Sequence, residues 1–181
     1  DYGAFASLTA DRDGIPHIAF YGEDRVTYYN VGWPTTAIAN VDFGGHVGRF
    51  IDLAVDQDVE PRAHLVYRDD DAGALKYATN RGGHWQTLFV DTDAPTGEHA
   101  AVVAAPGGRA HAAWSGGGLR YASHDVDDPL SSWDPELLDP DGSDPDLVLG
   151  DPGDGHVFIA YYVSDPGELW LATNESGAWV A

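Results

Sequence analysis

One short segment of this 181-residue chain recurs four times at a constant spacing. Each copy is an apolar stretch that ends in an aromatic residue. The four aromatic residues are Phe20, Tyr67, Trp114 and Tyr161, and each follows the previous one by 47 residues. Chance does not produce three identical steps, so the sequence indicates four tandem copies of one structural unit. We expect the four aromatic side chains to be buried at equivalent positions.

Each unit reads as four short strands joined by tight turns. In the second unit, residues 52–55 form an apolar stretch before the recurring segment, residues 75–78 form another after it, and residues 86–91 alternate as an outer strand does. The intervening segments are rich in Asp, Gly and Pro, which favour hairpin connections. No window has the apolar period of a helix.

Four-stranded units with a period of about 40 to 50 residues are typical of β-propeller blades. Residues 18–20 are apolar on both faces, as expected of a strand that neighbouring blades cover on both sides. The sequence therefore predicts an all-β, single-domain β-propeller of four tandem blades, either a complete four-bladed ring or part of a larger propeller. The predicted blades are residues 1–46, 47–95, 96–142 and 143–181. The outer strand of the last blade is expected to be incomplete, because only two residues follow Trp179.

Charge excludes some classes of partner. Thirty acidic residues and nine basic ones give a formal net charge of −21, so nucleic acid is not an expected ligand. A hydrophobic content of 43% is too high for a disordered acidic chain, which places the negative charge on a folded surface. Such a surface is typical of salt-adapted proteins, and an acidic face for Ca²⁺ or cationic ligands is the alternative. No apolar run approaches the roughly 20 residues of a membrane helix.

The turn before each unit's tryptophan has a signature of its own. Residues 78–85 read Ala-Thr-Asn-Arg-Gly-Gly-His-Trp, and residues 172–179 read Ala-Thr-Asn-Glu-Ser-Gly-Ala-Trp. Both resemble a degenerate Asp box, the Ser-x-Asp-x-Gly-x-x-Trp hairpin of sialidase-like (BNR-type) propellers, with Ala for Ser and Asn for Asp. The hairpin is longer in unit three and shorter in unit one. The resemblance implies that a tryptophan packs between blades in each unit, at Trp33, Trp85, Trp133 and Trp179. It implies architecture and not activity, because the box is structural and occurs in enzymes and binding propellers alike.

Three histidines, His17, His64 and His111, occupy one repeat position, where the fourth unit has Phe158. They could converge and hold a metal ion or another ligand, since neutral imidazole is a common ligand. The structural alternative is that each ring satisfies a neighbouring polar group and packs against the next blade.

Acidic turns suggest a metal only weakly. Asp11 and Asp13 precede Gly14 as in a fragment of a calcium loop, and Asp56 and Asp58 occupy the corresponding turn of unit two. Calcium takes six to eight oxygen ligands, so an ordinary hairpin turn is favoured over a Ca²⁺ site. No cofactor is predicted, and Ca²⁺ at these acidic turns is the alternative. The Asp-rich stretch 125–146 is interpreted as a solvated loop, with a cation site as the alternative.

Exposed aromatic residues near strand ends suggest a ligand surface. Tyr29, Tyr162 and Trp170 could stack on sugar rings, although blade packing explains them equally well. The eight arginines fall at unequal repeat positions, and nothing marks a convergent cluster, so no catalytic residue is predicted. The sequence favours a non-catalytic binding or scaffold module of an extracellular or surface protein, with a glycan or protein ligand. The alternatives are a fragment of a sialidase-like hydrolase or lyase, and a structural unit that self-associates through the unpaired edge of its last blade.

Overall fold

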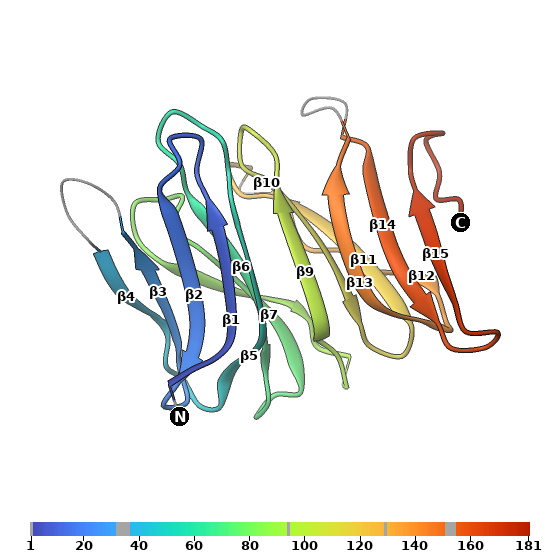
Figure 1. Cartoon of the computed structure of the whole chain (residues 1–181), viewed down its shortest axis with the longest axis horizontal. Helices are drawn as coiled ribbons and strands as arrows, with labels where there is room; N and C mark the ends of the chain where they lie inside the picture. The colour runs from blue at the N-terminus through green and yellow to red at the C-terminus, as the bar shows by residue number, and fades with distance from the viewer. Residues whose placement is uncertain (1, 32–36, 94, 129, 151–154) are drawn as a thin grey trace.

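The computed structural model describes residues 2–31, 37–93, 95–128, 130–150 and 155–181. Within these ranges the regular structure is entirely β, with fifteen strands in four antiparallel sheets (Figure 1). The same ranges contain no helix long and apolar enough to cross a membrane. The prediction of an all-β chain is confirmed.

Each sheet is a meander whose strands follow the order of the chain. The first sheet consists of β1 (Tyr2–Ala10), β2 (Pro16–Gly22), β3 (Val26–Asn30) and β4 (Ala37–Asp42). The second consists of β5 (Val47–Val55), β6 (Ala63–Asp69), β7 (Ala74–Thr79) and β8 (Gln86–Asp91). The third consists of β9 (Glu98–Ala104), β10 (Arg109–Ser115), β11 (Leu119–Asp125) and β12 (Glu136–Asp139). The fourth consists of β13 (Gly142–Leu149), β14 (Val157–Val163) and β15 (Glu168–Thr173), and beyond β15 the residue Val180 forms a single bridge with Thr173.

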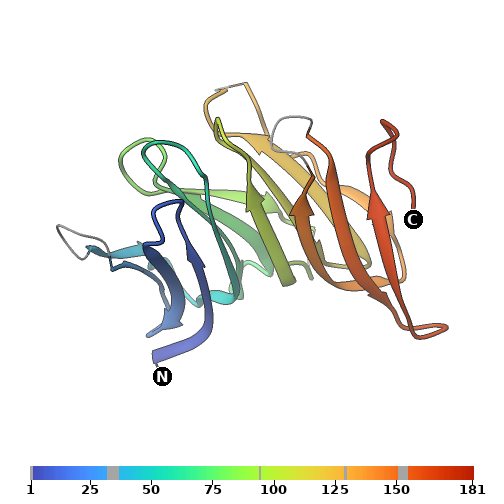
Figure 2. The same ribbon diagram turned by 45° about the horizontal axis from the view of Figure 1, so that its top comes forward.

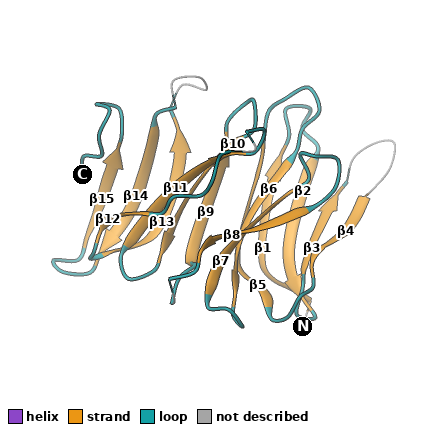
Figure 3. Cartoon of the chain, turned by 180° about the vertical axis from the view of Figure 1, so that it is seen from behind, coloured by secondary structure: helices purple, strands orange, loops and turns teal. Residues whose placement is uncertain are grey.

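The sheets stack in sequence order. The first strands β1, β5, β9 and β13 lie side by side, and the other strands of each sheet fan away from them (Figures 1 and 3). The first and fourth sheets lie at opposite ends of the stack, as do the two termini (Figure 2). Each sheet therefore packs face to face against its neighbours in the chain.

Three apolar cores fill the spaces between consecutive sheets. In the first core, Tyr28 of β3 meets Leu65 and Tyr67 of β6. The residue between these two, Val66, belongs to the second core and packs toward the third sheet. Side chains alternate across a strand, so β6 must be apolar on both faces to supply both cores. The apolar character of the recurring segment thus follows from its position between two neighbouring sheets.

The recurring aromatic residues point toward the preceding sheet. Tyr67, Trp114 and Tyr161 are 0%, 0% and 1% exposed. Phe20, expected to be equally buried, is only half-buried. Its equivalent face is the open face of the first sheet, which no preceding sheet covers among the described residues.

The tryptophans after the third strands pack across the same interfaces. Trp85, Trp133 and Trp179 lie edge-on to Tyr28, Tyr77 and Tyr121 of the preceding unit, with ring centroids 4.7–5.1 Å apart. Trp133 is buried, and the other two are partly buried. Trp33 lies outside the described residues. Each of the three described tryptophans therefore covers a tyrosine that would otherwise be exposed at the edge of a core.

Every first strand contains the same β-bulge. Phe5, Phe50, His99 and Asp144 have φ angles of 51°, 52°, 47° and 50°, and each follows a glycine by two residues. The strand pairing shifts at each of these points, so two residues oppose one on the second strand. Non-glycine residues in the left-handed region cost on the order of 1–3 kcal/mol each, and such strain persists where the surrounding structure over-determines it.

Candidate functional site

The three recurring histidines are buried. His17, His64 and His111 are 1%, 0% and 3% exposed, and the Nδ1 atom of each is hydrogen-bonded to a tyrosine hydroxyl on the adjacent strand. The partner tyrosines are Tyr28, Tyr77 at 2.6 Å and Tyr121 at 2.7 Å. Each imidazole is bonded to a tyrosine of its own sheet, and no group of three such side chains among the described residues is placed to hold one ion.

A carboxylate completes the pair in units one and two. His17 Nε2 lies 3.4 Å from Asp11 Oδ2, and His64 Nε2 lies 3.3 Å from Asp56 Oδ2. In unit three the equivalent turn position is Ala105, and the Nε2 atom of the buried His111 has no hydrogen-bond partner among the described residues. Burial therefore lowers the pKa of His111 to about 4.

In the fourth unit, all three residues of the Asp–His–Tyr group are replaced. Gly150, Phe158 and Leu171 stand where units one and two have Asp, His and Tyr. The phenyl ring of Phe158 lies where a side chain on Gly150 would extend, since a Cβ there would be 3.3 Å from Phe158 Cε2. This joint replacement indicates that the Asp–His–Tyr group holds the turn and the two strands together, with an apolar contact as its substitute.

The acidic turn residues are occupied by hydrogen bonds. Asp11 accepts from the backbone N–H groups of Asp13 and Ile15, each at 2.9 Å, which forms an ordinary turn. Asp56 and Asp58 both bind Arg81. The described residues contain no group of three or more His, Asp or Glu side chains placed to hold a metal ion. A calcium role for these residues stays a prediction.

The aromatic candidates do not share one surface. Tyr29 is half-buried in the first sheet. In the fourth sheet Tyr162 pairs with Leu169 and Trp170 pairs with Tyr161, so Tyr162 and Trp170 point to opposite faces. Their exposed fractions are 43% and 38%. The three side chains therefore cannot contact one ligand together.

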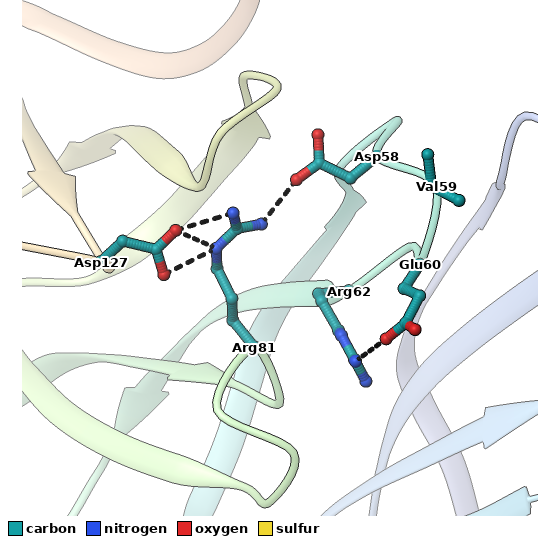
Figure 4. Close-up of a pocket in the computed structure, with 6 residues that line it drawn as sticks. All are labelled: Asp58, Val59, Glu60, Arg62, Arg81 and Asp127. Atoms are coloured by element: carbon teal, nitrogen blue, oxygen red, sulfur yellow. Dashed lines mark hydrogen bonds and ion pairs between the residues drawn. The ribbon is translucent and has the colours of Figure 1, made fainter.

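A hollow of about 430 Å³ lies between the turns of units two and three (Figure 4). Its lining residues are Asp58, Val59, Glu60, Arg62, Arg81 and Asp127. Residues 58–62 follow β5, Arg81 lies in the turn after β7, and Asp127 lies in the long connection after β11. The hollow therefore depends on the packing of two units against each other.

Arg81 joins the two sides of this hollow. Its Nη1 donates to Asp56 Oδ2 at 2.6 Å and to Asp58 Oδ2 at 2.9 Å, while Nε and Nη2 donate to Asp127 at 2.9 and 2.8 Å. Burial alone would raise the pKa of Asp56, but hydrogen bonds from His64 and the Arg62 N–H, together with the charge of Arg81, hold it below its usual value. The Asp56 carboxylate is therefore charged at neutral pH and fixed by its hydrogen bonds.

Two groups at the rim remain accessible. Arg62 Nη2 pairs with Glu60 Oε2 at 2.6 Å, and their side chains are 30% and 80% exposed. Between this pair and Asp58, the side chain of Val59 is 78% exposed. The rim thus combines a guanidinium, a carboxylate and an aliphatic side chain, which suits a ligand with both hydroxyl groups and an apolar face.

Sequence reasoning did not find this hollow. The sequence predicts Asp56 and Asp58 as residues of a hairpin turn, with Ca²⁺ as the alternative, and gives Arg81 no partner. The sequence shows an arginine in the turn before Trp85 and an excess of aspartates from Asp125 onward, but neither feature points to the other. The spacing of Arg81 and Asp127 along the chain gives no indication that they meet.

No protein-family model matches the sequence, and no curated protein matches it. Solved structures do match in fold. A lectin of Aleuria aurantia, described as a six-bladed β-propeller with a novel fucose recognition mode, has a TM-score of 0.63 at 14% identity over 97% of this chain and 59% of the lectin. The fold is a β-propeller. The SapL1 lectin, solved with α-methyl fucoside, gives 0.68 at 11% identity over 98% of this chain and 62% of the lectin.

Catalytic propellers are also similar. NanB sialidase from Streptococcus pneumoniae has a TM-score of 0.59 at 15% identity, over 92% of this chain and 29% of the enzyme. The chain thus spans about three fifths of the two lectins and less than a third of the sialidase. At these identities the likeness establishes the propeller fold and leaves the chemistry to the residues of this chain.

The Asp-box-like turns of units two and four have the same geometry. Asn80 Oδ1 accepts from the N–H of Ala63 at 2.9 Å, and Asn174 Oδ1 accepts from the N–H of Val157 at 2.7 Å. In both turns the third residue after the asparagine is a glycine whose N–H donates to the asparagine carbonyl at 2.9 Å. The asparagine therefore fastens the turn to the second strand of its own blade.

Proposed function

We propose that this chain is a carbohydrate-binding β-propeller module of an extracellular or cell-surface protein, which binds glycans without transforming them. The observation that carries the proposal is the inter-blade hollow, where Arg81 fixes three carboxylates while Arg62, Glu60 and Val59 stay accessible. Paired guanidinium and carboxylate groups bind vicinal hydroxyls, and an aliphatic side chain can contact the apolar face of a sugar. Of the two similar lectins, one is described by its fucose recognition and the other was solved with α-methyl fucoside, which supports this ligand class.

Calorimetric titration with methyl α-L-fucoside and β-1,3-galactotriose tests the proposal. Arg62→Ala removes an accessible guanidinium and should weaken binding at least tenfold. Arg25→Ala is the matched control, because Arg25 also pairs with a glutamate two residues earlier, Glu23 at 2.9 Å, but lies elsewhere. Equal loss in both variants, or no heat of binding with either saccharide, would reject this site. Turnover of a fluorogenic glycoside would reject the non-catalytic part of the proposal.

The proposal includes self-association through the outer face of the fourth blade. Val148, Tyr162, Leu169 and Leu171 are 56%, 43%, 78% and 55% exposed on or beside this face. The equivalent face of the third blade is buried against the fourth. The complementary open face of the first blade carries Leu8 and Ile38, 68% and 69% exposed, in one row across the sheet. The first blade of a second copy therefore offers a surface of the type that covers this face within the chain.

Light scattering at high salt tests the association. The chain should form dimers or larger species at micromolar concentration, and Leu171→Ser should shift it toward monomer. Leu130→Ser is the control, since Leu130 is 91% exposed in a loop. A strictly monomeric chain across this concentration range would contradict the association.

A further inference from the structure

The four bulge residues form a continuous row at the starting ends of the first strands. Phe5 and Phe50 have ring centroids 5.3 Å apart, and the ring of His99 lies 5.0 Å from that of Phe50. His99 Nδ1 lies 3.0 Å from Asp144 Oδ1. We call Phe5, Phe50, His99 and Asp144 the bulge row. Because the hollow beside Arg81 follows the other end of β5, the bulge row is separate from that site.

The bulges aim these side chains at one another. All four residues have φ near 50°, two residues after Gly3, Gly48, Gly97 and Gly142. A bulge re-aims a side chain relative to the regular alternation of a strand. Four non-glycine residues hold this conformation at one position of the repeat, which places one side chain from every blade in the row. Strained residues of this kind cluster at ligand-binding and active sites.

The bulge row is accessible to solvent, and its two halves differ in chemistry. Phe5 is 39% exposed, and the side chains of His99 and Asp144 are 53% and 51% exposed. The Arg49 guanidinium lies 5.3 Å from the centroids of both phenyl rings. One half of the row is therefore an aromatic platform, and the other half offers hydrogen-bond donors and acceptors.

A second hollow adjoins the polar half. It has a volume of about 250 Å³ and is lined by Pro95, Glu98, Ser115, Gly116, Gly117, Gly118, Gly142 and Ser143. The turn between β10 and β11 contains three consecutive glycines, whereas the corresponding turns of the other units carry charged side chains. A Cβ on Gly117 would have no neighbour within 4 Å, whereas a Cβ on Gly116 or Gly118 would lie 2.5 Å from Thr96 Oγ1 or Asp139 O. The space beside the turn is therefore open at Gly117.

The charges around the row limit the class of ligand. A cation over the phenyl rings would be repelled by Arg49, whose guanidinium already lies over one face of each ring. An anion would meet Asp144 and a net charge of −21, while Glu98 is paired with Arg68 at 3.2 Å. A neutral ligand with an apolar face and several hydroxyl groups avoids both penalties. Its face can stack on an aromatic ring while its hydroxyls bind the imidazole and carboxylate.

We propose that the bulge row and its adjoining hollow form a second binding site, for a neutral saccharide. The proposal rests on the proposed carbohydrate-binding function but assigns a different site from the inter-blade hollow. A sugar ring stacks on Phe50, its hydroxyls reach His99 and Asp144, and a following residue of the chain enters the space beside the three glycines. Asp144 acts here as an orienting group for His99 and as an acceptor for hydroxyls.

Amide chemical-shift mapping of the full chain tests the site. Methyl α-L-fucoside and β-1,3-galactotriose are the neutral probes, and choline and sialyllactose are the charged ones. We expect a neutral probe to shift the amides of Phe50, His99 and Asp144, and His99→Ala to weaken that response at least tenfold. Phe43→Ala should leave it within twofold, because Phe43 is a 75% exposed phenylalanine outside the row.

The outcomes separate the two sites. Shifts at the amides of Glu60 and Arg62 report the inter-blade hollow independently of the bulge row. The inference is overturned if neutral probes leave the row amides unshifted, if only a charged probe shifts them, or if His99→Ala has no effect. His99→Gln provides a second variant, and the wild-type map alone decides between these results if both variants unfold.

Discussion

Tyr67 donates a hydrogen bond from its hydroxyl to Asp42 Oδ2 over 2.8 Å, and thereby joins the second strand of one blade to the end of the outer strand of the blade before. The equivalent bonds are Trp114 Nε1 to Asp91 Oδ2 at 3.0 Å and Tyr161 Oη to Asp139 Oδ2 at 3.1 Å. Each blade interface thus has the same buried or half-buried polar link within an apolar core. The aromatic residue at the recurring position fills space and also satisfies a carboxylate.

Replacing Tyr67 by Phe should remove this link while keeping the ring. Asp42 would lose one donor and keep Lys76, so we expect a loss of about 1–2 kcal/mol in the free energy of unfolding. Urea unfolding measures it. Tyr29→Phe is the control, since Tyr29 makes no hydrogen bond through its hydroxyl among the described residues, and it should change stability by less than about 0.5 kcal/mol. Equal effects would contradict the role of the link.

Acid should destabilise the third blade through His111. Its pKa is about 4 in the folded chain and about 6.5 when unfolded, so below pH 6.5 the unfolded chain binds more protons. The resulting loss of stability begins as pH falls below 6.5 and reaches about 3 kcal/mol near pH 4. The double variant His111→Phe/Tyr121→Phe should unfold with a smaller pH dependence. Chemical denaturation at pH 7 and pH 4.5 gives the comparison, and parallel curves for the two proteins would argue against the assignment.

Ala105→Asp should rebuild in unit three the group present in units one and two. The new carboxylate would face His111 Nε2, as Asp56 faces His64 Nε2 at 3.3 Å. We expect a gain of about 1 kcal/mol at pH 7 and a higher pKa for His111. NMR titration of the imidazole reports the pKa. Gly150→Asp is the control, because Phe158 occupies the space there and the change should destabilise the chain.

Substitutions at two neighbouring glycines should distinguish the cost of a steric contact from the cost of backbone conformation. Gly107 and Gly108 have φ angles of 84° and 89°, but only at Gly108 would a Cβ meet a neighbour, 2.7 Å from Arg81 Cζ. Gly108→Ala should therefore displace Arg81 and cost about 2 kcal/mol more than Gly107→Ala. Thermal unfolding of both variants measures the difference. If the two variants are equally stable, the guanidinium is not held against Gly108.

Salt should stabilise the chain. With a net charge of −21, mutual repulsion of surface carboxylates is strong at low ionic strength, and the Debye length falls from about 30 Å at 0.01 M to about 3 Å at 1 M. The Tm should rise continuously over this range of NaCl. A flat profile would speak against a surface adapted to salt. Sodium and potassium chloride should act alike, because the effect is screening and not a specific ion.

The repeat carried most of the information about the fold. Its period predicted stacked four-stranded sheets, and the two-faced apolar segment around Tyr67 predicted burial on both sides. The prediction that Phe20 is buried was wrong, because the sequence does not show that this side chain faces away from the other sheets. The His–Tyr pairs were within reach of the sequence, since unit four replaces His and Tyr together. That comparison needs the register between strands, which the sequence alone did not supply.

The sites were harder to predict because they depend on contacts between units. Arg81 meets Asp127 only after two sheets have packed, and nothing in their sequence spacing indicates the contact. The sequence has Gly-x-Phe at residues 3–5 and again at 48–50, but it does not show the left-handed conformation that turns the bulge residues toward one another. At Asp11 the predicted hairpin turn has the backbone donors that such a turn requires, whereas the binding of Asp56 and Asp58 by Arg81 was not predicted.

Each core joins only two consecutive sheets, and this arrangement determines how the molecule opens. The middle sheets each contribute to two cores, while the first and fourth each contribute to one. Cooperativity is then passed from neighbour to neighbour, as in a linear array of coupled elements. Amides of β6 and β10 should exchange with solvent most slowly, and those of β3 and β15 should exchange early through opening at either end. A perturbation in one terminal sheet would be attenuated at every interface it crosses before it reached the other.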